Sequence, residues 1–244
     1  MPRTTARWTA DRGRIFLRVT WTVVSVLVVQ VAICGAAATP VLLAWTWLLA
    51  LPLADPLRSA VLGSAIVPSY VAFALILMPV SALTCRALGW RTPPNAQMVI
   101  REFGWPLLRW VRCMVATHVV RVFAGFLLRG TPIWTAYLRL AGARLGRRVY
   151  INSLGLSDYN LLEFGDDVVI GADVHLAGHT VEGGVVKTMG VRLGRHVTIG
   201  VGSVVDIGVE AGDGSQVGAL SLVPKQTKLA PGAVYVGIPV CRLH

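Results

Sequence analysis

The last hundred residues of the chain repeat an aliphatic side chain at every sixth position. Seven consecutive positions keep this spacing without a slip: Leu193, Ile199, Val205, Ala211, Val217, Val223 and Leu229. The residue after each is mostly glycine, and the fourth residue after each is small or branched, as at Val197 and Ser203. A period of six fits neither an α-helix nor a pleated strand. It is typical of a parallel β-helix, in which each hexad supplies one short strand and one corner.

The same register extends upstream and is broken at two places. Its earlier positions are Leu145, Ile151, Phe164, Ile170 and Leu176. One extra residue lies between Ile151 and Phe164, and the stretch from Glu182 to Arg192 interrupts the pattern again. Three hexads close one triangular coil, so residues 145–244 predict roughly four stacked coils. Every third hexad then lies on one face, which predicts three stacked faces: Leu193 with Ala211 and Leu229, Ile199 with Val217, and Val205 with Val223.

Residues 1–144 have a different composition, with 15 arginines, no lysine and three acidic residues. Val19 to Ala38 and Ser59 to Cys85 carry no charged residue, and each is long enough to cross a bilayer core of about 30 Å. These runs predict a transmembrane helical anchor over residues 1–90. Val41 to Ala54 is also apolar but follows Pro40. We interpret it either as a re-entrant half-helix or as a full span if the first helix ends near Cys34.

Arginines flank the apolar runs on both sides. They are Arg3, Arg7, Arg12, Arg14 and Arg18 before the first run, and Arg86, Arg91, Arg101, Arg109 and Arg112 after the second. Because positive flanks stay in the cytoplasm, this distribution predicts two crossings and a multi-pass protein of the cell membrane with its β-helix on the cytoplasmic side. A signal peptide is less favoured, because the first run is long and a second long run follows.

Residues 91–144 mix tryptophans and arginines, such as Trp105 and Trp110 with Arg109 and Arg112. This mixture is typical of helices in the membrane interface and equally of a packed helical neck, so we expect an interfacial helical neck over this range. A nucleic-acid partner is not expected, because the arginines are interleaved with membrane segments and no nucleic-acid-binding motif accompanies them. The four cysteines have no paired spacing and are expected to be small buried side chains.

Several short motifs resemble one enzyme family. Hexapeptide repeats that end on Val236-Gly237-Ile238-Pro239 resemble the hexapeptide-repeat acyltransferases, whose fold is an all-β left-handed parallel β-helix. The resemblance is narrower over residues 128–240, where the motifs follow the order seen in the membrane-embedded C-terminal modules of poly-ε-lysine-synthetase-like peptide synthetases. These motifs are Gly130-Thr131-Pro132, Tyr137-Leu138-Arg139, Gly142-Ala143-Arg144-Leu145-Gly146, Ser157-Asp158 and Gly178-His179-Thr180-Val181-Glu182.

The resemblance implies an acyltransferase that moves an acyl or aminoacyl group from a thioester to an amine or hydroxyl, with amide-bond formation in peptide biosynthesis as one form. It implies coenzyme A or carrier-protein phosphopantetheine as the thioester co-substrate, no tightly bound cofactor or metal, and a homotrimer. The membrane segments add lipid as an expected partner. The fold expected for the whole chain is therefore a β-helix preceded by an α-helical transmembrane and interfacial region.

Acyl transfer requires a base that removes the acceptor's proton, and histidine is the side chain whose neutral form suits this task near pH 7. His179 immediately precedes the larger interruption, so we expect it to be the general base. Glu182 is expected to orient its ring, and Asp158, at the other break, is expected to do the same from the neighbouring coil. Asp158 as a turn residue is equally compatible with the pattern.

Three further residues are candidates for substrate binding. His175 precedes His179 by four residues and is either a partner of it or a trimer contact. Lys225 and Lys228, near the final coils, would hold phosphates of coenzyme A or phosphopantetheine, or else are ordinary surface charges.

Two other functions remain open at this level. A zinc hydro-lyase resembling γ-carbonic anhydrase uses three histidines on the same fold, and His175, His179 and His196 match that number, although not its spacing. A membrane-anchored trimeric scaffold without catalysis is the other, since one fold hosts several roles.

Overall fold

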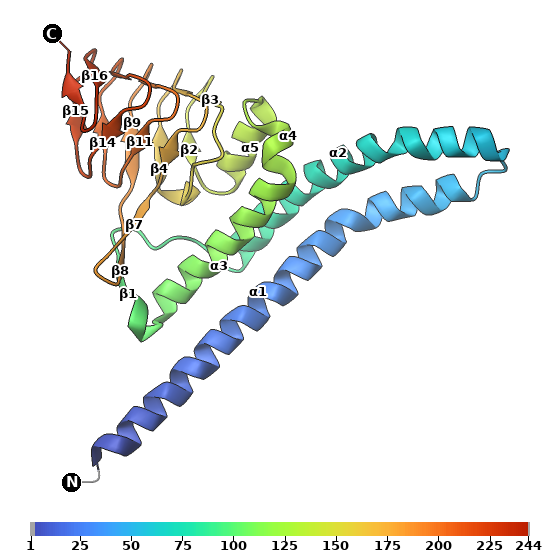
Figure 1. Cartoon of the computed structure of the whole chain (residues 1–244), viewed down its shortest axis with the longest axis horizontal. Helices are drawn as coiled ribbons and strands as arrows, with labels where there is room; N and C mark the ends of the chain where they lie inside the picture. The colour runs from blue at the N-terminus through green and yellow to red at the C-terminus, as the bar shows by residue number, and fades with distance from the viewer. Residues whose placement is uncertain (1–2, 244) are drawn as a thin grey trace.

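The computed structural model describes the backbone of residues 3–243 and side chains from residue 12 onward, so the side chains of Arg3 and Arg7 lie outside the described part. Two long helices form one arm of the molecule, and a stack of β-coils lies beside them, with shorter helices between (Figure 1). The C-terminus lies at the far end of the coil stack.

The helical arm is an antiparallel pair, α1 (Arg3–Leu49) and α2 (Asp55–Ala87). α1 runs without interruption through Pro40, so both interpretations of Val41 to Ala54 as a separate segment are wrong. A proline inside a helix removes one amide donor and bends the helix, but the apolar run on both sides keeps the remaining backbone in helical hydrogen bonds. Trp45 Nε1 donates to Ser69 Oγ at 2.8 Å and ties the two helices together.

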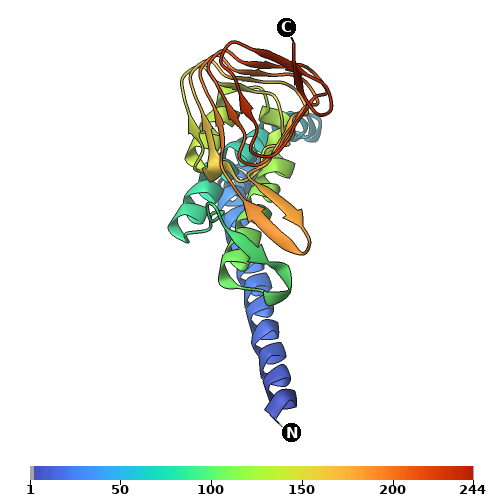
Figure 2. The ribbon, with the colours of Figure 1, turned by 90° about the vertical axis from the view of Figure 1, so that its left-hand side faces the viewer.

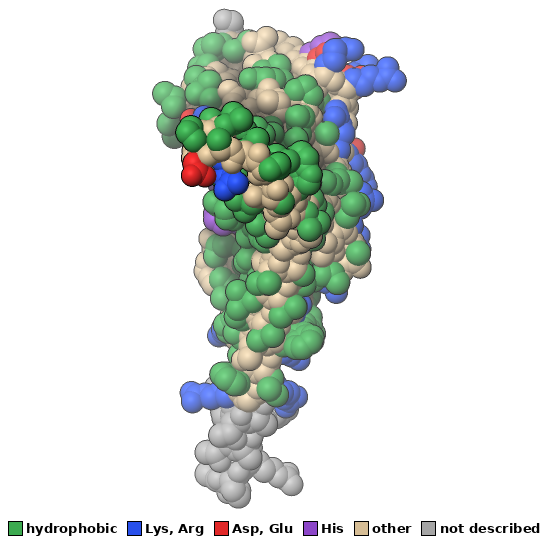
Figure 3. All heavy atoms as spheres, turned by 90° about the vertical axis from the view of Figure 1, so that its right-hand side faces the viewer, with side chains coloured by type: hydrophobic (Ala, Val, Ile, Leu, Met, Phe, Trp, Pro, Cys, Tyr) green, Lys and Arg blue, Asp and Glu red, His purple; other side chains and the backbone are tan. Residues whose placement is uncertain are grey.

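Three helical stretches are long and apolar enough to cross a membrane: Arg12–Leu49, Asp55–Ala87 and Trp105–Leu128. Figure 3 shows the face formed around this arm, which is covered mainly by hydrophobic side chains. The third stretch lies inside the segment that the sequence assigned to an interfacial neck. Two crossings therefore stay a prediction, for which the structure offers three candidate helices.

The neck contains α3 (Trp105–Val120), a π-helical turn η2 (Arg121–Gly125), α4 (Phe126–Leu128) and α5 (Pro132–Leu140). α3 lies between the long helices and the coil stack (Figure 1). Arg112 is buried where α3 meets α1, with its Nε donating to Ser25 Oγ at 3.0 Å. Its guanidinium also lies 5.9 Å from the ring centroids of Trp90 and Trp105. The neck is thus packed against the helical arm through the buried charge of Arg112, which contacts a hydroxyl and two aromatic rings.

The β-helix consists of three columns of two- or three-residue strands that pair in parallel. The first column is β2 (Arg144–Leu145), β4 (Leu162–Phe164), β9 (Val191–Leu193), β12 (Glu210–Ala211) and β15 (Lys228–Leu229). The second is β3 (Tyr150–Ile151), β5 (Val169–Ile170), β10 (Thr198–Ile199), β13 (Gln216–Val217) and β16 (Val234–Val236), closed by antiparallel β17 (Cys241–Arg242). The third is β6 (His175–Leu176), β11 (Val204–Val205) and β14 (Leu222–Val223).

The predicted register is confirmed in all three columns. Ala211 pairs with Leu193 on one side and with Leu229 on the other, and the other two faces stack in the same way. These aliphatic side chains are buried inside the coil. The glycine that follows most of them is required by close stacking, since a Cβ on Gly200 would lie 2.4 Å from the backbone nitrogen of Ala219. The six-residue period therefore encodes both the core and the tight corner of each coil.

Both breaks in the register are structured. At the first, Asp158 adopts a left-handed backbone (φ 53°) and leads into the turn η3 (Tyr159–Leu161). At the second, β7 (His179–Glu182) and β8 (Val185–Thr188) form an antiparallel hairpin. Its turn is Gly183 and Gly184, both with positive φ, which suits a two-residue hairpin turn.

The hairpin projects from the coil stack and is joined by a strand from the neck (Figure 2). This strand, β1 (Gln97–Val99), follows α2 and precedes the short turn η1 (Ile100–Glu102). It pairs antiparallel with β8, so that Met98 lies opposite Val186. The expected boundary near residue 145 is therefore bridged by a shared three-stranded sheet, and this sheet fixes the position of His179.

Candidate functional site

The two register breaks bring one histidine and one carboxylate together. His179 is the first residue of β7, and its Nδ1 lies 2.5 Å from Asp158 Oδ2. Gly178 allows this approach, because a Cβ there would lie 2.9 Å from the Cβ of Asp158. Aspartate is one of the few residues that tolerate the left-handed backbone found at Asp158. The inserted residue in the hexad pattern thus turns this carboxylate toward the base of the hairpin.

The Asp158 side chain is fully buried and saturated with donors. Thr92 Oγ1 donates to Oδ1 at 2.7 Å, Trp110 Nε1 donates to the same oxygen at 3.1 Å, and Ser157 Oγ donates to Oδ2 at 3.1 Å. Burial alone would raise the pKa of this carboxyl, but the bond and charge of His179, with Thr92 and Ser157, outweigh it and lower the pKa of Asp158. The carboxylate is therefore ionised at neutral pH.

His179 has one protected and one available ring nitrogen. Because a carboxylate only accepts hydrogen bonds, Nδ1 carries the proton that lies between the two groups. This leaves Nε2 unprotonated in the neutral ring and able to take a proton. The His179 side chain is 25% exposed, and the Trp110 ring packs against it edge-on, with centroids 5.0 Å apart. The arrangement can accept a proton and stabilise the resulting imidazolium with the buried carboxylate.

Glu182 does not orient His179, which corrects that expectation. It lies at the far end of β7, where Lys187 Nζ is 3.2 Å from Oε2 and Lys225 forms an ion pair with the other oxygen. Strand geometry explains the difference, since residues three apart on a strand point to opposite faces of the sheet. His179 instead contacts Asp158, which lies on the neighbouring coil.

The proposed substrate-binding residues do not converge on the histidine. Lys225 forms an ion pair with Glu182. Lys228 lies on an exposed face, with its Nζ 3.4 Å from Oε2 of Glu210. His175 is an exposed residue of β6, opposite Val204 of the next coil. These residues lie on the outer surface of the β-helix, and their role in binding stays a prediction.

The histidines are also separate from one another. His196 has a left-handed backbone, and its Nδ1 lies 3.7 Å from Oδ2 of Asp167. It is on a different corner of the β-helix from the His179–Asp158 pair. Within the described part of this single chain, no group of three histidine, cysteine or acidic side chains is placed to hold a metal ion. Three cysteines, Cys34, Cys85 and Cys113, are wholly or partly buried as expected, whereas Cys241 is exposed.

Two residues of the site, Thr92 and Trp110, were not identified from the sequence. Thr92 lies in the connection after α2 with no surrounding motif, and Trp110 was interpreted only as an interfacial aromatic residue. The spacing of Trp110 within an amphipathic helix gives no hint that its indole nitrogen points into the β-helix. Only the packing of the neck on the first break places both donors on Asp158.

An apolar cavity of about 270 Å³ adjoins this site. The ring of Trp110 forms part of its wall, together with Val181 and Val186 of the hairpin. The opposite wall includes Val19, Thr22 and Val23 of α1, within a stretch apolar enough to span a membrane. The cavity thus lies between the surroundings of His179 and helix α1.

No protein-family model matches the chain. The delta-poly-L-ornithine synthetase of Acinetobacter baumannii (strain AB307-0294) is 25% identical over 112 residues, which are 46% of this chain and 8% of the synthetase. The galactoside O-acetyltransferase of Escherichia coli (strain K12) is 32% identical over 120 residues, which are 46% of this chain and 57% of that enzyme. The chain therefore spans little more than half of one curated relative and less than a tenth of the other.

Two solved structures can be named beside these relatives. A hexapeptide-repeat acetyltransferase from Vibrio cholerae is 22% identical, with 43% of this chain and 62% of that chain covered and a TM-score of 0.39. A galactoside acetyltransferase in complex with coenzyme A is 21% identical, with 55% and 78% covered and a TM-score of 0.40. The predicted resemblance to hexapeptide-repeat acyltransferases and to a peptide synthetase module is confirmed by the curated relatives.

Proposed function

We propose that this chain, whose homologues are hexapeptide-repeat acetyltransferases and a poly-ornithine synthetase, is a membrane-embedded acyltransferase with His179 as its general base. The observation that carries the proposal is the 2.5 Å contact between His179 Nδ1 and the fully buried Asp158 carboxylate. Asp158 is the positioning residue, since it acts through the imidazole and not on the substrate.

The reaction is direct transfer from a thioester of coenzyme A or of a carrier-protein phosphopantetheine. Nε2 of His179 takes the proton of the acceptor amine or hydroxyl as the nitrogen or oxygen attacks the thioester carbonyl. The tetrahedral intermediate then expels the thiolate, which receives the proton from the imidazolium. The products are an amide or ester and a free thiol, and no covalent enzyme intermediate is needed. Throughout, the Asp158 carboxylate offsets the positive charge of the ring.

The apolar cavity supports an amphiphilic acceptor. Its outer wall belongs to α1 and its inner wall to Trp110, whose ring contacts His179. An acceptor that enters from the bilayer would place its alkyl portion between these walls and its amine or hydroxyl beside the histidine. The similarity to a poly-ornithine synthetase favours an amine acceptor and an aminoacyl donor, hence peptide-bond formation.

The arrangement in the cell follows from the helices and their charges. The long apolar helices would cross the cell membrane, and the arginines at the start of α1 and the end of α2 would keep both flanks in the cytoplasm. The β-helix and His179 would then face cytoplasmic thioesters. The protein would assemble as a homotrimer through the outer faces of the β-helix, where His175 is exposed.

The test is thiol release from a panel of thioesters by purified protein in detergent. Acetyl-coenzyme A and an ornithyl thioester would be offered with and without amine and hydroxyl acceptors. We expect acceptor-dependent thiol release, with kcat lowered about 10²–10⁴-fold in His179→Ala. His196→Ala is the matched control, because this histidine is on another corner of the same fold. Equal turnover by wild type and His179→Ala would overturn the assignment and favour the scaffold. Stoichiometric zinc on the same samples would favour the hydro-lyase.

A further inference from the structure

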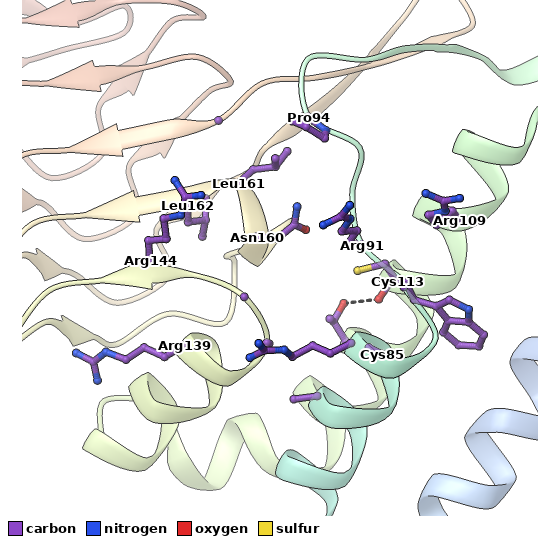
Figure 4. A pocket seen from close by; sticks show the side chains of 18 of the residues that line it. Cys85, Arg91, Pro94, Arg109, Cys113, Arg139, Arg144, Asn160, Leu161 and Leu162 are labelled. Carbon is purple, nitrogen blue, oxygen red and sulfur yellow. Dashed lines mark hydrogen bonds between the residues drawn. The ribbon is translucent and has the colours of Figure 1, made fainter.

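A second, larger cavity of about 870 Å³ lies between the helical part and the first strands of the β-helix. Its walls come from the end of α2, the segment before β1, the side of α3, α5, and the strands β2, β4 and β9. Figure 4 shows Arg91 and Arg109 on the helical side and Arg139 and Arg144 on the opposite side. His179 does not line this cavity, so it is distinct from the site of acyl transfer.

The wall of this cavity is strongly basic. Its arginines are Arg86, Arg91, Arg109, Arg139, Arg144 and Arg192. Glu163 is the one carboxylate among the described lining residues, and it is shared by Arg144 at 3.8 Å and Arg192 at 3.6 Å. Arg91 and Arg109 have no acidic partner in the part of the chain that the structure describes. The cavity thus carries excess positive charge on both walls.

Such a cluster is suited to phosphate. Guanidinium groups bind phosphate oxygens through two parallel hydrogen bonds, which a lysine ammonium does not do. Residues 1–144 contain 15 arginines and no lysine, and five of the six lining arginines come from this part. Like charges that converge on one cavity repel one another unless an anion lies between them.

The cavity also lies at the ends of two apolar helices. Arg86 is in the last turn of α2, and Arg109 is near the start of α3. Both helices lie in stretches apolar enough to cross a membrane. Behind the arginines, the wall between α2 and α3 is formed by small side chains, Ser81, Cys85, Cys113 and Thr117. A basic cavity between membrane helices on the cytoplasmic side fits an anionic lipid head group.

We propose that this cavity binds the phosphate-bearing head group of an anionic membrane lipid, with its acyl chains along α2 and α3. The phosphate lies between Arg91 and Arg109 on one wall and Arg144 of β2 on the other. The guanidinium of Arg139 donates instead to the backbone carbonyls of Leu145 and Gly146. This binding can be measured without acyl transfer, because His179 does not line the cavity.

The lipid site is physically connected to Asp158. Asn160 lines the cavity and holds Thr92 by two hydrogen bonds, accepting from its backbone nitrogen at 3.1 Å and donating to its carbonyl at 2.9 Å. Thr92 in turn donates to Asp158. Because Arg91 immediately precedes Thr92, a head group bound to Arg91 holds the segment whose hydroxyl bonds to Asp158.

The test is a binding titration of the full chain in neutral detergent with dioctanoyl phosphatidate, followed by tryptophan fluorescence, because Trp90 lines the cavity. We expect saturable binding by wild type and about tenfold weaker binding by Arg91→Gln/Arg109→Gln. Arg101→Gln/Arg129→Gln removes the same charge from the helical part outside the cavity and is expected to bind as wild type does. Arg91→Lys/Arg109→Lys, which keeps the charge and the fold but loses the paired hydrogen bonds, is expected to bind with intermediate affinity.

Three results would overturn the proposal. Equal affinities in the cavity and control double variants would show that binding is not in this cavity. Equal binding of dioctanoylglycerol, which has no phosphate, would show that the head group is not recognised. Coenzyme A that displaces phosphatidate, and that loses affinity in the cavity variant, would assign the arginines to the thioester donor. None of these readouts involves turnover, so they are independent of the experiment on His179.

Discussion

The hydroxyl of Thr92 donates a 2.7 Å hydrogen bond to Asp158, although 66 residues separate them in the sequence. Thr92 follows the helical arm, whereas Asp158 lies at the first break in the register of the β-helix. The bond joins the two parts of the chain at the residue that positions His179. The neck that follows the helical arm therefore completes the candidate active site and is more than a connection to the β-helix.

Removal of this hydroxyl is expected to lower turnover without loss of the fold. Thr92→Val keeps the shape of the side chain but leaves Asp158 without one of its donors. Hydrogen bonds to charged groups contribute about 1.5–3 kcal/mol, so kcat should fall about tenfold or more. Thr92→Ser keeps the hydroxyl and should retain most of the wild-type kcat. Steady-state kinetics with circular dichroism would check this, and a Thr92→Val enzyme with wild-type kcat would contradict the role given to Thr92.

Asp158 and Glu182 should differ sharply in their effect on catalysis. Asp158→Asn keeps the size of the side chain but removes the charge that fixes the tautomer of His179, so kcat should fall about 10²–10⁴-fold. Glu182→Gln affects only the ion pairs with Lys187 of the hairpin and Lys225 of the coil stack, and should change kcat less than about threefold. Comparison of kcat and KM for the two variants separates the arrangement seen in the structure from the one expected from the sequence. A larger fall in kcat for Glu182→Gln than for Asp158→Asn would refute the role given to Asp158.

The stability of the fold should depend on the ionisation of Asp158 at acidic pH. Because the pKa of Asp158 is lowered in the folded protein, its charge stabilises the fold above the unfolded pKa of about 3.9. That stabilisation is lost as the pH falls through the lower folded value. Asp158→Asn should therefore lower Tm at pH 6, and the difference from wild type should shrink below about pH 4.

Thermal unfolding in detergent, followed by circular dichroism between pH 6 and pH 3, measures this difference. Asp173→Asn serves as the control, because its carboxylate is exposed in its ion pair with Arg129 and should contribute little to stability. A Tm difference for Asp158→Asn that stays constant over the whole range would be inconsistent with an ionised Asp158 in the folded state.

The apolar cavity can be filled from its exposed side. Val23 on α1 lines the cavity and is 51% exposed, so Val23→Trp should occupy part of it without disturbing the core. KM for an acceptor with a long alkyl chain should rise about tenfold, while KM for a short-chain analogue should change little. Val24→Trp is the matched control, since the neighbouring Val24 is also exposed but does not line the cavity. The same rise in both variants would argue against an alkyl site there.

The sequence by itself determined the β-helix, its register and the location of its defects. An aliphatic residue at every sixth position, in most cases followed by a glycine, is a local pattern that repeats. Every third repeat then stacks on the same face. Leu193, Ala211 and Leu229 could therefore be aligned without knowledge of any distant contact, and they are aligned in the structure. The apolar runs likewise determined the long helices, although not that α1 continues through Pro40.

Only the tertiary structure decided which residues lie together at the two breaks in the register. The insertion after Leu176 could have been a loop, but it pairs with β1 from the neck and forms a hairpin. Asp158, and not Glu182, faces His179, because the left-handed backbone at the first break turns its carboxylate inward. Thr92 and Trp110 reach the same carboxylate from 66 and 48 residues away. Contacts of this kind depend on how separate elements pack against one another, and no periodicity along the chain encodes them.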